Sequence, residues 1–163
     1  MRLDHALEWA ASAHKRFGQD LPIDIRTICR AVKLYVRHEP LHEDTGGYLL
    51  RTPKRWYAVI NSRFPEERQR WALAHELGEY MLVRQRERKG EQFPRGELRV
   101  YEPRKERFCD RFAANLLMPQ SAVRAQSAEV HHSPGNSKVD VLAGRFAVSA
   151  QAMRLRLREI RSQ

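Results

Sequence analysis

Several features that define whole classes of protein are scarce or missing in this sequence of 163 residues. No apolar stretch approaches the roughly 20 residues that a transmembrane helix requires, and the N-terminus carries no apolar run like that of a signal peptide. The only two cysteines, Cys29 and Cys109, are too few for a disulfide framework. We therefore expect a cytoplasmic protein that does not contact a membrane and keeps both cysteines reduced and buried.

Acidic residues are also fewer than basic residues in this sequence. The 30 lysines and arginines outnumber the 20 aspartates and glutamates, which gives a formal net charge of +10. Such a balance suits binding to nucleic acid or to an acidic protein, although it carries no information about the fold. A chain of this length fits one domain with a substantial hydrophobic core.

The hydrophobic period changes twice along the first part of the chain. Helical spacing is followed by alternating segments and then by helical spacing again, with strands expected near residues 34–38, 47–52 and 55–62. Because no crossover helix separates these strands, we expect a small, mainly antiparallel sheet (about residues 34–61) packed on helices in an α+β fold. Residues 85–102 are highly charged and interrupted by glycine and proline, which predicts an exposed, mobile loop.

The most informative stretch is residues 65–90, PEERQRWALAHELGEYMLVRQRERKG. Proline and glutamates at its start, arginines near its end and apolar residues at helical spacing predict a long central helix. It contains His75-Glu76-Leu77-Gly78-Glu79, one residue away from the H-E-x-x-H metallopeptidase helix, since Glu79 stands where a second histidine is expected. On these five residues alone, an ordinary helix with Glu79 paired to an arginine explains the pattern as well as a metal site does.

The spacing of this motif has a chemical reason. Residues four apart on a helix lie one above the other, so His75 and Glu79 can reach the same metal ion. Carboxylate oxygen is an accepted zinc ligand, although it is harder than imidazole and adds a negative charge. Glu76 points to a neighbouring face, where it can hold a metal-bound water as general base. We therefore assign His75 and Glu79 as candidate ligands and Glu76 as the candidate catalytic residue.

A second helix that bears on this site is predicted between Pro103 and Pro119, over PRKERFCDRFAANLLMP. Glu106 falls at the edge of its apolar stripe, so its carboxylate is well placed to reach a partly buried ion. Glu106 is therefore the third candidate ligand. The alternative is that Glu106, in the first turn, simply interacts favourably with the helix dipole.

Together these two helices resemble the ImmA/IrrE family of bacterial and phage metallopeptidases. RQRWALAHELGEYML and ERFCDRFAANLLMP are similar to the family's H-E-x-x-H helix and to the later helix that supplies an acidic ligand, and Asn61 and Ser62 match the end of its preceding strand. The resemblance covers most of the chain. It implies a zincin-like fold, a divalent metal bound by His75 and Glu106, and a helix-turn-helix repressor of a phage, mobile element or stress response as the substrate.

The departure from the family pattern at Glu79 changes the expected chemistry. Two carboxylates and one imidazole neutralise a divalent ion more fully than two imidazoles do, so a bound water should be less acidic. Zinc is the first expectation, and manganese, a harder ion, is the second. An occupied but slow site and an empty one are both open. His42 or the pair His131 and His132 could complete the ligand set, although a surface position is the simpler interpretation of each.

The sequence divides into a metallopeptidase-like domain at residues 1–130 and a C-terminal hairpin at 138–163. Two helices around Ala147-Val148-Ser149 resemble half of a helix-turn-helix, with Ser149 as a good N-cap. If the hairpin binds DNA as a helix-turn-helix does, the candidates for phosphate contacts are Arg154, Arg156 and Arg158. We favour the alternative that the hairpin packs on the same domain and its arginines face solvent, because the resemblance includes a similar L-A-x-x-F-x-V-S segment.

Two functions from different classes follow. The first is a regulatory, metal-dependent endopeptidase that cleaves a helix-turn-helix repressor, with Glu76 taking the proton of the attacking water. The second is a catalytically weak or inactive relative that binds a repressor or DNA through its basic surface. Glu79 discriminates between them, because this residue decides how well a metal ion is bound.

Overall fold

The computed structural model describes residues 4–18, 20–98, 102–130 and 137–162. The helices are α1 (Asp4–Phe17), α2 (Ile25–Ala31), α3 (Glu66–Glu87), α4 (Pro103–Leu117), α5 (Gln120–Glu129), α6 (Lys138–Phe146) and α7 (Ala150–Arg161). The strands are β1 (Leu34–Glu39), β2 (Gly47–Arg51), β3 (Trp56–Asn61) and β4 (Gly96–Leu98). The predicted α+β class is confirmed. Among the described helices, none combines the length and apolar character needed to span a membrane.

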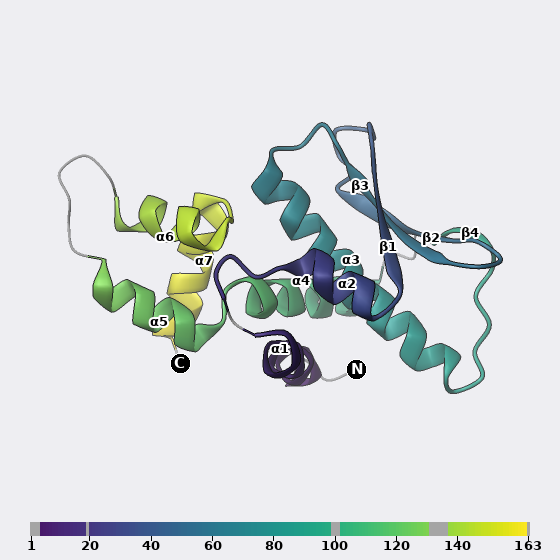
Figure 1. The fold of residues 1–163 in the computed structure, drawn as a ribbon, viewed down its shortest axis with the longest axis horizontal. Helices are drawn as coiled ribbons and strands as arrows, with labels where there is room; N and C mark the ends of the chain where they lie inside the picture. Colours follow the sequence, from purple (N-terminus) through teal and green to yellow (C-terminus); the bar gives the residue numbers. More distant parts are fainter. Residues whose placement is uncertain (1–3, 19, 99–101, 131–136, 163) are drawn as a thin grey trace.

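The helix that carries the HELGE motif, α3, lies in the middle of the molecule (Figure 1). It contacts β2 and β3 on one side and α4 on the other, and α1 in turn packs on α4. Burial therefore extends around its central turns rather than along one stripe. The remaining helices, α5 to α7, gather at the end of the molecule away from the sheet (Figure 1).

The sheet has the strand order β1-β3-β2-β4. β2 pairs antiparallel with β3 and with β4, as expected for a mainly antiparallel sheet, but β1 pairs in parallel with β3. β1 therefore departs from the antiparallel pairing that the absence of crossover helices led us to expect. The physical reason is burial: Ala58, Val59 and Ile60 of β3 are fully buried, and a strand that is apolar on both faces belongs in the centre of a sheet.

Two segments differ from the sequence prediction. Residues 85–102 are not one exposed loop, because α3 continues to Glu87 and residues 96–98 form β4. Leu98 of β4 is buried opposite Leu49 of β2, which explains why this short segment joins the sheet. After Pro119, α5 follows directly, a helix that sequence patterns did not predict, since Val123 is its only fully buried apolar position among the described residues.

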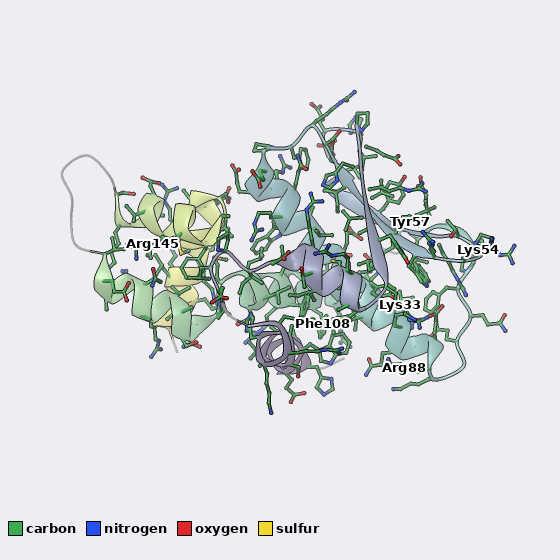
Figure 2. The ribbon with its side chains drawn as sticks, in the orientation of Figure 1. Lys33, Lys54, Tyr57, Arg88, Phe108 and Arg145 are labelled. Carbon is green, nitrogen blue, oxygen red and sulfur yellow. The ribbon has the colours of Figure 1, made fainter. Side chains whose placement is uncertain are left out.

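The helical layer is held together by aromatic and polar contacts. Trp9 of α1 meets Phe108 of α4 edge to face, with ring centroids 5.3 Å apart. His14 of α1 also makes a hydrogen bond to the carbonyl oxygen of Leu116, at 2.9 Å. Figure 2 shows Phe108 between α1 and α4, whereas Arg145 lies far away at the end formed by α5 to α7. These contacts fix α4, and with it Glu106, against α1.

The C-terminal hairpin packs on the same core. Arg70 of α3 donates to the carbonyl of Ala147 in the hairpin turn, and Ser149 caps α7 by accepting from the amide of Ala152. Arg156 is only 3% exposed and donates to the Met118 carbonyl and to Asn115. Arg156 therefore has a structural role in this conformation and is not free to contact phosphate, because its donors are used inside the protein. Arg154 and Arg158, by contrast, are exposed.

Candidate functional site

A cavity of about 380 Å³ opens beside the middle of α3, which we call the α3 cavity. Its wall is formed by α3, by the first turn of α4, by strands β2 and β4 and by the loop residues that flank them. The lining residues are Gly46, Gly47, Tyr48, Phe64, Arg68, Trp71, Ala72, His75, Glu76, Glu79, Leu98 and Glu106. All four residues assigned from the sequence as catalytic or metal-binding therefore face the same space.

His75 is the centre of the polar cluster. Its Nε2 lies 3.3 Å from Oε2 of Glu106, and its Nδ1 lies 2.9 Å from Oδ1 of Asp110. The structure thus brings His75 and Glu106 together from two helices, while Asp110, one turn after Glu106, holds the imidazole ring in place. Burial alone would lower the pKa of His75, but the hydrogen bond to Asp110 and the charge of Glu76 outweigh it and raise that pKa.

Glu76 is the most deeply buried acid of the cavity. Its Oε2 atom is inaccessible to solvent and has no hydrogen-bond partner among the described residues. Burial, reinforced by the negative charge of Glu79, raises the pKa of Glu76 to about 8. A buried carboxyl oxygen without a partner is unusual in a folded protein, and a strongly shifted pKa inside a cavity is typical of a functional group.

Glu79 is bound differently from what its place in the motif suggests. Its carboxylate accepts a hydrogen bond from the ammonium group of Lys105, and both side chains are only 9% exposed. Sequence reasoning missed Lys105 and the contact of Asp110 with His75. A signal for Lys105 was present, because it lies seven residues before the buried Phe112 and so belongs to the apolar stripe of α4.

The predicted ligands fit a metal ion only in part. Two donors bound to one tetrahedral zinc ion at about 2.0–2.1 Å lie roughly 3.3–3.4 Å apart. The separation of His75 and Glu106 matches this value, but the carboxylate of Glu79 is occupied by Lys105. In the described ranges, no group of three or more His, Cys, Asp or Glu side chains is arranged to hold a metal ion. As it stands, the set of three is not a zinc site.

The other candidate histidines do not complete this set in the part of the chain that is described. His42 is largely exposed and lies beside Asp44 in the loop between β1 and β2. His131 and His132 lie outside the described residues. Among the described residues, the polar cluster around His75 is therefore formed by α3 and α4.

Residues 29–158 match the family model of peptidase M78, described as an IrrE N-terminal-like domain. The chain belongs to the peptidase M78 family. The resemblance seen in the HELGE and ERFCDRFAANLLMP segments is thereby confirmed. The peptidase M78 family is a metallopeptidase-type family.

A solved structure described as a Mycobacterium tuberculosis transcriptional regulator has a similar fold, with a TM-score of 0.58 and 15% sequence identity. The match covers 94% of this chain but only 46% of the other, so this M78 chain spans less than half the length of that neighbour. At this identity, the likeness concerns the fold alone. No curated protein matches the chain.

Proposed function

We propose that this chain is a regulatory M78 protein that binds a polypeptide segment of a transcriptional regulator in the α3 cavity, with little or no hydrolysis. One observation carries this proposal: the carboxylate of Glu79, at the position of the motif's second histidine, is paired with the ammonium group of Lys105. The positive charge that a metal ion would bring to this position is thus supplied by the protein itself.

The electrostatic consequence is direct. A divalent cation that approaches Glu79 is repelled by Lys105, and it must separate a buried ion pair before the carboxylate can bind it. Removing one partner of such a pair leaves an uncompensated buried charge, which costs about 3–5 kcal/mol. Because both side chains are 9% exposed, water does little to screen this cost. Metal binding in the native chain is therefore weak.

The type of partner is supported by two further points. The sequence resemblance implies a helix-turn-helix repressor, and the similar solved structure is described as a transcriptional regulator. The net charge of +10 also suits an acidic partner surface. We infer a cytoplasmic location, which agrees with two free, buried cysteines, Cys29 and Cys109.

Metal-dependent cleavage of the repressor is the second candidate function, and three observations favour it. His75 and Glu106 already have the separation of two zinc ligands, Asp110 orients the imidazole, and the unpartnered Glu76 lies in the same cavity. In this alternative, zinc or manganese is held by His75, Glu79 and Glu106, which requires Glu79 to leave Lys105. A bound divalent ion would supply a Lewis acid, and Glu76 would act as the proton acceptor.

The two candidates are separated by metal content and by the mass of the partner. Purified protein is incubated with zinc or manganese, dialysed and examined by elemental analysis, beside the double variant Glu79→His with Lys105→Met. We expect the native chain to retain far less metal than the double variant. A helix-turn-helix repressor encoded nearby should bind without a change in mass. Stoichiometric metal in the native chain, together with repressor cleavage that is lost in Glu76→Gln, would establish the second candidate instead.

A further inference from the structure

A second and larger hollow, of about 990 Å³, lies between the N-terminal half of α3, α4 and α7; we call it the α7 groove. It adjoins the α3 cavity, because Arg68 and Trp71 line both spaces. Asp110 also connects them, since it lines the groove and makes the hydrogen bond to His75. The α3 cavity and the α7 groove therefore meet at these residues.

The groove presents an apolar surface. Leu155 of α7 is 57% exposed and is one of only three large apolar side chains that are exposed in the described ranges. Trp71 and Ala152 lie beside it in the lining and are partly buried. An exposed leucine that faces a concave, partly apolar surface offers a contact for an apolar side chain of a partner.

The charges of the groove are unbalanced. Of its carboxylates, Asp110 is paired with His75 and Glu159 with Arg156, which leaves Glu67. Its arginines Arg68, Arg107 and Arg111 have no carboxylate partner in the part of the chain that the structure describes; Arg68 instead stacks on Phe64.

Arg111 provides the sharpest observation. Its Nε atom is buried and has no hydrogen-bond partner among the described residues. A buried donor without a partner is destabilising, and a carboxylate that reaches the Arg111 guanidinium from the groove would supply a charge-assisted hydrogen bond. The groove thus combines free guanidinium groups with an apolar contact.

We propose that the α7 groove binds an acidic polypeptide segment, which directs carboxylates to Arg107 and Arg111 and an apolar side chain to Leu155 and Trp71. The inference rests on the proposed function, because the segment belongs to the partner whose chain enters the α3 cavity. A polypeptide is favoured over nucleic acid because the apolar contact offered by Leu155 and Trp71 has no role in binding a phosphate backbone.

The test uses the full chain and a short fluorescein-labelled peptide built from glutamate, leucine and alanine, followed by fluorescence anisotropy. A peptide with lysine in place of glutamate and a labelled DNA duplex serve as competing probes. Arg111→Gln and Leu155→Ser alter the groove. Arg161→Gln, on the same helix but outside the groove, and Leu7→Ser, at an exposed leucine of α1 (37% exposed), are the matched controls. Thermal unfolding followed by circular dichroism verifies that each variant folds.

The acidic peptide should bind, and each groove variant should weaken it by about tenfold, while the controls stay within about twofold. Peptide binding that is equally strong in groove and control variants overturns the groove assignment and leaves the proposed function standing. Binding of DNA without binding of the acidic peptide would also overturn the groove assignment. The proposed function would still stand in that case, provided that the regulator itself binds to the native chain. If neither the peptide nor the regulator binds to the native chain, both proposals are overturned.

Discussion

A Cβ atom at Gly78 would lie 2.9 Å from Cδ1 of Phe112, at the contact between α3 and α4. Gly78 sits between His75 and Glu79 on α3, and Phe112 follows Glu106 and Lys105 on α4. The absence of a side chain at position 78 therefore sets how closely the two halves of the candidate site approach. A larger residue must push the helices apart or displace a buried aromatic ring.

We expect Gly78→Ala to destabilise the protein by about 1–3 kcal/mol, because overpacking outweighs the gain in helix propensity. The matched control is Gly144→Ala in α6, where an added Cβ meets nothing within 4 Å. This control should stabilise the protein by up to about 1 kcal/mol. Urea unfolding of both variants measures the difference, and equal effects of the two substitutions would contradict the close packing of α3 on α4.

The pair formed by Lys105 and Glu79 gives a second prediction. Lys105→Met should destabilise the protein by about 3–5 kcal/mol, since the carboxylate of Glu79 then stays buried without its partner. The double variant Lys105→Met with Glu79→Leu should recover most of this loss, because no charge remains buried. Denaturant titrations of the single and double variants form the test. A double variant as unstable as Lys105→Met alone would show that the ion pair is not the cause.

A third prediction concerns pH. The pKa of Glu76 is raised from its ordinary value of 4.5 to about 8 by burial, so the folded protein keeps a proton that the unfolded chain loses. Stability from this group is fully present below about pH 4.5 and is lost as the pH rises towards 8. Glu76→Gln stays neutral, so its free energy of unfolding relative to the native chain should rise over this window. A difference that is constant between these pH values would argue against a shifted Glu76.

The buried cysteines allow a chemical test of the fold. Burial raises the pKa of the Cys29 thiol to about 12 and also raises that of Cys109. Neither residue should react with Ellman's reagent at pH 8 in the folded protein, because the thiolate is the reactive form and both side chains are buried. Both should react once guanidinium chloride is added. Rapid reaction of one thiol in the native state would contradict the packing of α2 or α4.

Much of the candidate site could be predicted because it is local. His75, Glu76 and Glu79 are related by helical spacing, and the position of Glu106 at the edge of an apolar stripe follows from the same period. These patterns place each side chain on a face of its own helix without knowledge of distant contacts. The meeting of Glu106 with His75 was implied by the family resemblance, and it depends on the packing of α4 on α3. The ion pairs and hydrogen bonds of these side chains could not be predicted in this way, because spacing along a helix does not determine which neighbour each carboxylate contacts.

The sequence by itself determined the helices that carry the site, the α+β class and the excess of positive charge. Only the tertiary structure decided that β3, the most buried strand, lies between β1 and β2, and that Arg156 is used inside the protein. It also decided the pairing of Glu79 with Lys105, 26 residues apart. The reason is that short-range periodicity fixes the face of a helix on which a residue lies, whereas the packing of α4 on α3 fixes which charges meet there.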